Sequence, residues 1–187
     1  MRLFSGTANL DLSKKIAHHL NKPLSDINIS NFPDGETKII INESVRKQDC
    51  YIIQSTGPSE HNSVNDNIME LCILCDALKR GSANSVNIVM PYYGYQRQDR
   101  KDYSRAPITA KVVASFLETI DADRIIVVDL HAGQIQGFFS NKTPFDNIYI
   151  ESVFTDYITK NVGIKNSIVI SPDIGGMKRA VRIANKL

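Results

Sequence analysis

The chain has 187 residues, enough for one ordinary domain or for one domain and part of another. Hydrophobic residues make up 42% of it and charged residues 22%, which is typical of a soluble globular protein. The formal net charge is only +2, and no apolar run approaches the roughly 18 residues that span a bilayer, so neither nucleic acid nor a membrane is an expected partner.

The first half of the chain alternates helical and strand patterns. Residues 1–6 lack the apolar core of a signal peptide, so we expect a cytoplasmic protein. Leu12, Ile16 and Leu20 fall on one face of a predicted helix over residues 11–20. The elements predicted next are strands over 37–45 and 49–56 and a helix over 67–80.

The helix over 67–80 contains a Cys-x-x-Cys pair, Cys72 and Cys75. This spacing occurs in redox and zinc sites. Both cysteines follow the helical spacing of Ile68, Leu71 and Leu78, however, and no second cysteine or histidine pair completes a metal set. We therefore predict that both thiols are small hydrophobic groups facing the core.

The second half of the chain continues the alternation. Its predicted elements are strands over 85–93, 123–130 and 166–171 and helices over 108–120, 151–160 and 175–187. Consecutive apolar residues, as in Ile125 to Val128, suit a parallel sheet that is covered on both faces. The alternation predicts an α/β fold with a doubly wound, mainly parallel sheet, in which ligands bind at the carboxyl ends of the strands. Proline and asparagine cluster over 141–147, which predicts a domain boundary there.

Polar residues follow two of these strands. Asp129 and His131 end the strand over 123–130, where this fold class keeps its chemistry. Asp173 follows the strand over 166–171 and precedes two glycines that open a helix, an arrangement that suits a phosphate or a metal–phosphate ligand. Structural roles remain open for all three: a turn cap for Asp129, a hydrogen-bond partner of the backbone for His131, and the N-cap of the following helix for Asp173.

A charged loop over residues 94–107, which we call the arginine loop, follows the strand over 85–93. It holds four basic residues among acidic and aromatic ones. One interpretation is a solvated charged loop, and the other is that Arg97 and its neighbours contact a polyphosphate through charge-assisted hydrogen bonds. Nucleic acid is the weaker candidate, because the loop is mixed in charge.

The segment Phe32-Pro33-Asp34-Gly35-Glu36 contains a strong turn signal. A turn explains Pro33 and Gly35 but not Phe32. A binding site, in which Phe32 stacks on a base while Asp34 and Glu36 accept hydrogen bonds from an amine, therefore remains equally open.

Several segments, taken in order, resemble the ribose-phosphate pyrophosphokinase family, the phosphate-dependent phosphoribosyl pyrophosphate synthetases. They are RLFSGTANLDL, FPDGE, NESVR, QST…NDNIMEL, PYYGYQRQDRK, SRAPITAK, DLHAGQIQGFF and SPDIGG, and they cover essentially the whole chain. The resemblance implies phosphoribosyltransferase-like domains: an N-terminal domain on the ATP side, residues 1–147, and the incomplete beginning of a second, similar domain, residues 148–187.

The resemblance also implies a reaction, in which the C1 hydroxyl of ribose 5-phosphate attacks the β-phosphorus of Mg-ATP and AMP leaves. Positioning and charge neutralisation carry most of the catalysis in such transfers. The implied cofactor is Mg²⁺, the implied ligands are ATP and ribose 5-phosphate, and the implied assembly is a homo-oligomer, in the family a hexamer built from dimers.

The family's functional residues match positions in this chain. They are, for ATP binding, Phe32, Asp34, Gly35, Glu36, Arg97, Gln98 and Asp99; for catalysis, Arg97 and His131; for metal binding, Asp129, His131, Asp146 and Asp173; and for regulatory phosphate or ADP, Ser44, Arg46, Ser104 and Arg105. Magnesium prefers oxygen ligands, so we expect His131 to act through water or through a phosphate oxygen.

The chain departs from the family pattern at a few positions. Ser140 stands where relatives often carry an aspartate, which leaves a metal contact there open although Asp146 still matches. Gln96 replaces a small residue, and Pro33 replaces a small polar one. The acidic, Gly/Thr-rich loop for ribose 5-phosphate and the flexible catalytic loop would follow Leu187, so we expect this chain alone to be inactive.

Three interpretations of the function remain. The first is a diphosphotransferase of which this chain is a part. The second is a non-catalytic homologue that binds nucleotide or regulates a full-length partner by co-assembly. The third, a type I phosphoribosyltransferase, needs neither the RQDRK nor the FPDGE segment, so these segments argue against it.

Overall fold

The computed structural model describes residues 1–165 and 167–187. The chain divides into two compact units, Met1–Asn147 and Ile148–Leu187. In chain order the elements are β1 (Arg2–Ser5), α1 (Leu10–His19), β2 (Ile27–Asn31), β3 (Thr37–Ile41), β4 (Asp49–Ile53), α2 (Val64–Arg80), β5 (Ser85–Met90), α3 (Thr109–Thr119), β6 (Arg124–Val128), the 3₁₀ helix η1 (Gly133–Phe138), β7 (Phe145–Ile148), α4 (Glu151–Asn161) and α5 (Met177–Lys186). Among the described residues, no helix combines the length and the apolar composition that a membrane span requires.

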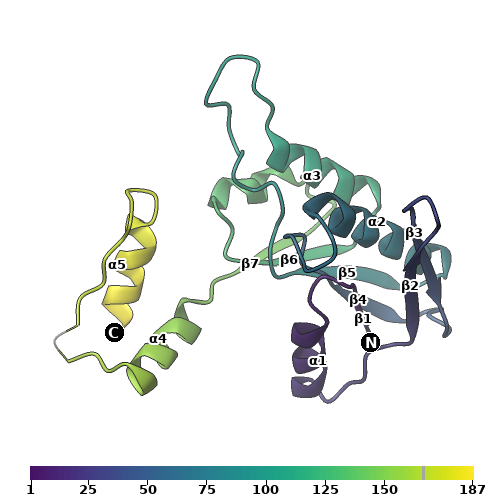
Figure 1. Cartoon of the computed structure of the whole chain (residues 1–187), viewed down its shortest axis with the longest axis horizontal. Helices are drawn as coiled ribbons and strands as arrows, with labels where there is room; N and C mark the ends of the chain where they lie inside the picture. The colour runs from purple at the N-terminus through teal and green to yellow at the C-terminus, as the bar shows by residue number, and fades with distance from the viewer. Residues whose placement is uncertain (166) are drawn as a thin grey trace. The chain divides into compact units, whose positions relative to one another are not determined.

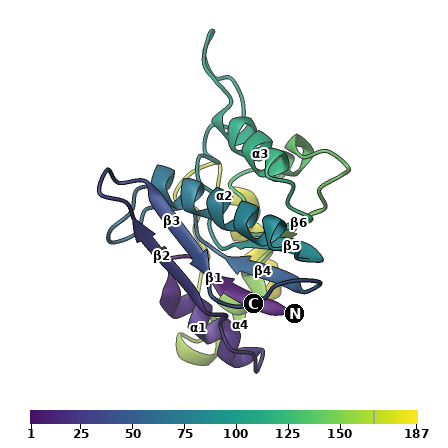
Figure 2. The same cartoon turned by 90° about the vertical axis from the view of Figure 1, so that its right-hand side faces the viewer.

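The first unit is built on a five-stranded sheet in the order β1-β4-β5-β6-β7. The pairs β1 with β4, β4 with β5, and β5 with β6 are parallel. Helices α2 and α3 lie over one face of this sheet and α1 lies over the other, as Figures 1 and 2 show. The predicted α/β fold with a mainly parallel sheet between helices is therefore confirmed.

The hydrophobic core lies between the sheet and helices α2 and α3. Leu71, Leu74 and Leu78 of α2 are fully buried at the helical spacing that the sequence shows. Cys75 is fully buried among them and Cys72 packs against the same core, as predicted. Burial raises the pKa of the Cys75 thiol to about 12 and also raises that of Cys72, so both thiols stay protonated at neutral pH and act as small hydrophobic groups.

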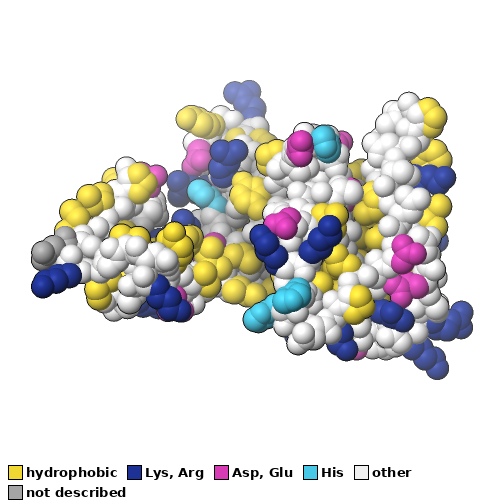
Figure 3. Space-filling model, turned by 60° about the horizontal axis from the view of Figure 1, so that its bottom comes forward, with side chains coloured by type: hydrophobic (Ala, Val, Ile, Leu, Met, Phe, Trp, Pro, Cys, Tyr) yellow, Lys and Arg dark blue, Asp and Glu magenta, His cyan; other side chains and the backbone are white. Residues whose placement is uncertain are grey.

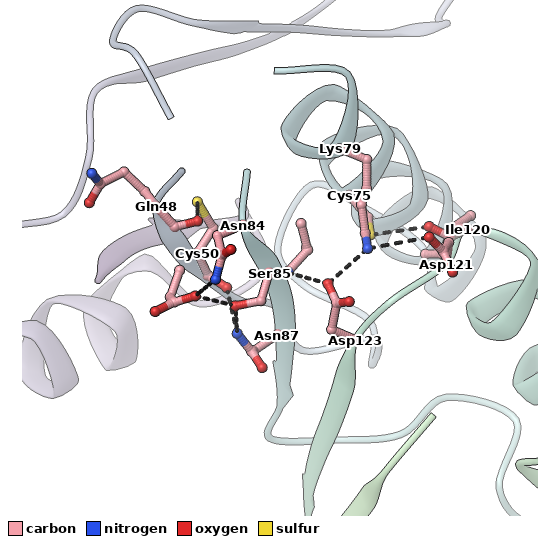
Figure 4. A network of polar contacts seen from close by, with 12 residues as sticks. Gln48, Cys50, Cys75, Lys79, Asn84, Ser85, Asn87, Ile120, Asp121 and Asp123 are labelled. Atoms are coloured by element: carbon pink, nitrogen blue, oxygen red, sulfur yellow. Dashed lines mark hydrogen bonds and ion pairs between the residues drawn. The ribbon is translucent and has the colours of Figure 1, made fainter. Parts of the chain in front are cut away.

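Side chains tie together the amino-terminal ends of the central strands (Figure 4). Asp49, the first residue of β4, accepts a hydrogen bond from Ser85 Oγ of β5 at 2.8 Å. Asp123, just before β6, accepts one from the backbone N–H of Val86 at 2.6 Å and pairs with Lys79 Nζ of α2 at 2.8 Å. The charged groups at this edge thus stabilise the fold by joining neighbouring strands and α2, whereas the predicted site residues that follow β5 and β6 lie at the opposite, carboxyl edge.

Some short elements were not predicted. Strand β2 pairs antiparallel with β3 in a separate two-stranded sheet, with Ile27 opposite Ile41. Its two isoleucines, Ile27 and Ile29, are too few to mark a strand on their own, and the strand forms because β3 supplies its hydrogen-bond partners. The four-residue strands β1 and β7 are also too short to be marked by the sequence, and they form because neighbouring strands supply their hydrogen-bond partners.

The strand predicted over 166–171 is wrong for residues 167–171, whereas Asn166 lies outside the described residues. Ile168 and Ile170 are 81% and 74% exposed. A strand needs a neighbouring strand to bond with, and the described part of the second unit offers none to this apolar run. Figure 3 shows hydrophobic side chains exposed on this unit, at the left of the view.

Candidate functional site

The carboxyl ends of β5 and β6 lie side by side because the two strands pair in parallel, with Met90 opposite Val127. The arginine loop, residues 94–107, follows β5 and projects away from the sheet beyond α3 (Figure 1). The segment with Asp129 and His131 follows β6. Two of the predicted site segments therefore begin at neighbouring points of one sheet edge.

Two side-chain contacts join these segments. Gln96 is buried, and its Oε1 accepts a hydrogen bond from the backbone N–H of His131 at 2.7 Å. Asp99 Oδ2 accepts a second hydrogen bond from Gln134 Nε2 of η1. The arginine loop and the residues after β6 are thus held together by their own side chains.

The base of the arginine loop is fixed at both ends. The backbone N–H of Gly94 donates to Thr56 Oγ1 at 2.7 Å. Gln98, a predicted ATP-binding residue, is half-buried; its Oε1 accepts from Thr109 Oγ1 at 3.1 Å and its carbonyl accepts from the backbone N–H of Ala110 at 3.2 Å. Gln98 therefore anchors the start of α3, while its neighbour Arg97 is exposed and, among the described residues, has no carboxylate within ion-pair distance.

The residues after β6 adopt an unusual backbone. Asp129 has a φ of 45°, a left-handed conformation that aspartate tolerates better than most residues. Leu130 is buried, and its backbone N–H donates to Asn147 Oδ1 at 3.2 Å. With Leu130 fixed in the core, Asp129 is half-buried and His131 is exposed. Strained backbone of this kind is frequent at binding and catalytic sites.

Within the first unit, the structure does not bring the predicted metal residue Asp146 together with Asp129 and His131. Asp146 of β7 forms an ion pair with Arg124, the first residue of β6, whereas His131 lies beyond the other end of that strand. Asp173 belongs to the second unit, where its Oδ1 accepts from the backbone N–H of Gly176 at 2.7 Å. This bond closes the turn before α5, but the N-cap of that helix is Gly176 and not Asp173, so the N-cap alternative is wrong. The part of the chain that the structure describes contains no group of three or more His, Cys, Asp or Glu side chains that could hold a metal ion.

Asp129 offers a carboxylate at the carboxyl edge of the sheet, directly after β6. Magnesium at phosphate sites is usually held by one or two carboxylates, water and the phosphate oxygens of the substrate. The donors at this edge therefore fit a magnesium ion that arrives with a nucleotide better than a cage made of protein ligands alone. Metal contacts by Asp146 and Asp173 stay predictions.

The Phe32–Glu36 segment forms the turn between β2 and β3. Gly35 has a φ of 95°, and its N–H donates to the carbonyl of Phe32 at 2.9 Å. Asp34 Oδ1 accepts from the backbone N–H of Glu36 at 3.1 Å. Phe32 is 45% exposed and Lys38 Nζ lies 5.4 Å from the centroid of its ring. The turn is confirmed, and Figure 2 shows it at the end of a hairpin beside the sheet. The aromatic ring of Phe32 at this turn is open to solvent.

The predicted regulatory residues lie on the surface. Ser44 and Arg46 follow β3 on either side of Val45, which is buried. Ser104 and Arg105 are exposed in the distal part of the arginine loop, where Arg105 has a φ of 65°. A regulatory role for these four residues stays a prediction.

A buried polar network near the carboxyl ends of β1 and β4 was not predicted. Glu70 of α2 is 3% exposed and accepts from the N–H and the Oγ1 of Thr7, at 2.7 and 2.6 Å. Gln54, just after β4, donates its Nε2 to the same carboxylate at 2.8 Å. The only sequence signal was polar residues placed in and directly after apolar elements. Because every member is hydrogen-bonded, the network fixes the turn between β1 and α1.

Comparison with known proteins identifies relatives along the whole chain. The model of the N-terminal domain of ribose phosphate pyrophosphokinase matches residues 1–120. The ribose-phosphate pyrophosphokinases of Campylobacter jejuni and Helicobacter pylori strain J99 are 51% and 50% identical to the whole chain, which spans 58% and 56% of their lengths. The crystal structure of phosphoribosylpyrophosphate synthetase from Mycobacterium smegmatis superposes with a TM-score of 0.91 at 38% identity, covering 99% of this chain and 60% of that one.

Proposed function

Since this chain belongs to the ribose-phosphate pyrophosphokinase family, we propose that it binds Mg-ATP for transfer of the diphosphoryl group to the C1 hydroxyl of ribose 5-phosphate. The products are phosphoribosyl pyrophosphate and AMP. The observation that carries this proposal is the junction of two segments at one sheet edge, where Gln96 of the arginine loop holds the backbone of His131 at 2.7 Å. Ligands of doubly wound sheets bind at this edge.

The chemistry follows from the groups that this edge exposes. Arg97, with its guanidinium exposed, forms charge-assisted hydrogen bonds with phosphate oxygens and neutralises part of their charge. The imidazole of His131 donates a hydrogen bond to a phosphate oxygen or to a water molecule. Asp129 is the residue that would hold Mg²⁺, and the bound ion would supply charge neutralisation at the β- and γ-phosphates.

The hairpin between β2 and β3 is the proposed adenine contact. Phe32 offers an exposed ring face for stacking, and Lys38 occupies a position near the same ring. The carboxylates of Asp34 and Glu36 accept hydrogen bonds from the exocyclic amine. We propose that this segment serves the site of a neighbouring subunit, as the family resemblance implies, so a homo-oligomer is part of the proposal, as is a cytoplasmic location.

The first test is nucleotide binding by the 187-residue chain. Calorimetry should show binding of Mg-ATP, and Arg97→Ala should weaken it by about 1–3 kcal/mol, roughly 5- to 150-fold in Kd, because one charge-assisted hydrogen bond is lost. The matched control is Arg80→Ala, since Arg80 is an exposed arginine of α2 that pairs with Asp76 at 2.7 Å. Equal affinities of the unaltered chain and Arg97→Ala would remove Arg97 from the site.

The second test separates binding from catalysis. The chain spans 58% of the length of its relative from Campylobacter jejuni, and its sequence holds no acidic, Gly/Thr-rich loop for ribose 5-phosphate. We therefore predict that the chain alone releases no AMP from ATP and ribose 5-phosphate, measured by chromatography of the nucleotides. Turnover by this chain would contradict the prediction that AMP release needs the ribose 5-phosphate loop.

The alternative is a non-catalytic homologue that binds nucleotide or co-assembles with full-length enzyme. It predicts the same nucleotide binding, so the reading frame distinguishes the two. A frame that continues beyond codon 187 into a ribose-phosphate loop supports the enzyme. A stop codon at that point supports the alternative.

A further inference from the structure

Gln96 is the one glutamine of the arginine loop whose side chain is buried, at 6% exposure. Its Oε1 accepts the hydrogen bond from the backbone N–H of His131 at 2.7 Å. Because Gln96 directly precedes Arg97, this single contact joins the residue before the proposed phosphate-binding arginine to the proposed catalytic histidine.

The backbone N–H of His131 requires a hydrogen-bond acceptor from outside the sheet. His131 lies past Val128, the last residue of β6, so the sheet no longer supplies its N–H with a carbonyl. The chain has also turned at Asp129, whose φ is 45°. The N–H of Leu130 is met by the amide side chain of Asn147, and the N–H of His131 by that of Gln96. Two amide side chains thus hold the backbone that places His131.

We propose that Gln96 is a positioning residue of the nucleotide site, which fixes His131 relative to Arg97 without touching the ligand. The inference rests on the proposed function for its consequence, but the hydrogen bond itself exists without a ligand. An uncharged amide at position 96 adds no further negative charge next to a triphosphate. A small residue at position 96 has no acceptor that reaches His131, so in this chain the coupling of the two segments depends on the glutamine.

The link between Asp99 and Gln134 gives the same two segments a second connection. That contact joins side chains only, whereas the contact of Gln96 reaches a backbone N–H. Loss of Gln96 is therefore expected to alter the position of His131 while the loop stays attached.

The experiment uses Gln96→Met, which removes the acceptor and keeps the size of the side chain, and reads the amide of His131 by NMR hydrogen exchange. In the unaltered chain we expect this amide to exchange slowly, and in Gln96→Met at least about tenfold faster. Gln96→Glu, which retains a side-chain oxygen, should keep the protection. Gln136→Ala is the control, since Gln136 is exposed and its side-chain Nε2 donates to the carbonyl of Gly133, at 3.0 Å, within the same short helix.

The second readout is the Kd for Mg-ATP, which should rise about tenfold in Gln96→Met and stay unchanged in Gln136→Ala. Fast exchange of the His131 amide in the unaltered chain would overturn the proposal, and so would equal exchange in Gln96→Met. Faster exchange without a change in Kd would reduce Gln96 to a structural role and overturn the positioning claim. An unaltered chain that binds no nucleotide would instead contradict the proposed function, and the exchange rates would still decide whether the hydrogen bond exists.

Discussion

Gly94 begins the arginine loop at a point where no side chain fits. A Cβ built there would lie 2.5 Å from the backbone oxygen of Thr56 and 3.0 Å from Val64 Cγ1. The oxygen belongs to backbone next to β4 and cannot rotate away as a side chain does. The glycine therefore lets the loop start close against the core, and the position of Arg97 three residues later depends on it.

At this residue we predict that Gly94→Ala lowers the free energy of unfolding by about 1–3 kcal/mol, as overpacking of a dense core does. It should also weaken Mg-ATP binding, because the loop must shift. Urea unfolding followed by circular dichroism measures the first effect and calorimetry the second. The matched control is Gly137→Ala in η1, where a Cβ would meet nothing within 4 Å, and which should change stability by less than about 0.5 kcal/mol. Equal effects of the two substitutions would contradict this account.

Single residues also show what sequence reasoning reaches. Arg97, Asp129 and His131 were predicted as site residues because they follow strands, and strand order alone places the ends of those strands at one edge. From the sequence, Gln96 was noted only as a departure from the family pattern, because the partner of its side chain is a backbone N–H of a segment 35 positions away. A contact of that kind has no signature in the sequence, since it exists only when the two strands pair.

At the scale of elements, helices α4 and α5 of the second unit are joined through one carboxylate. Glu151, the first residue of α4, is 5% exposed and accepts a hydrogen bond from Arg182 Nε of α5, with Lys186 Nζ at 3.5 Å. Burial raises the pKa of Glu151, but the hydrogen bond and charge of Arg182, together with Lys186, outweigh it and hold the pKa below its usual value. Glu151 therefore stabilises the helix pair while it is ionised.

A carboxylate with a lowered pKa in the folded state contributes stability that is present above its unfolded pKa and is lost as the pH falls through the folded value. We predict that acidification below about pH 4.5 weakens the contact between α4 and α5. The NMR signal of Arg182 Nε–H should shift as the pH falls through this acidic range, whereas in Glu151→Gln the same signal should not change with pH. Glu60→Gln serves as the control, because Glu60 is exposed in the first unit. If the Arg182 Nε–H signal titrated in Glu151→Gln as it does in the unaltered chain, a group other than Glu151 would be responsible for the pH dependence.

The elements divide into those that carry their own signal and those that depend on a partner. The long helices and the central strands β4, β5 and β6 were predicted, because helical spacing and consecutive apolar residues mark them. Strand β2 was missed because its own sequence gives little strand signal, and it forms only through pairing with β3. The strand predicted over 166–171 was wrong for its described residues. Ile168 and Ile170 have the pattern of a strand, but among the described residues there is no strand for them to pair with.

At the scale of the molecule, the two edges of the parallel sheet have different uses. The amino-terminal edge is tied together by Asp49, Asp123 and Lys79, whose charges are already paired or hydrogen-bonded. The carboxyl edge leaves Arg97 and His131 exposed. The alternation of strands and helices predicted this polarity, but only the strand order β1-β4-β5-β6-β7 makes the loops after β5 and β6 neighbours.

The most direct test of the central claim is an NMR titration of the ¹⁵N-labelled 187-residue chain with Mg-ATP. We predict that the amide signals of residues 94–99 and 129–134 shift together with one common Kd, while those around Asp49 and Asp123 stay in place. Shifts confined to the amino-terminal edge, or different Kd values for the two carboxyl-edge segments, would contradict a shared nucleotide site.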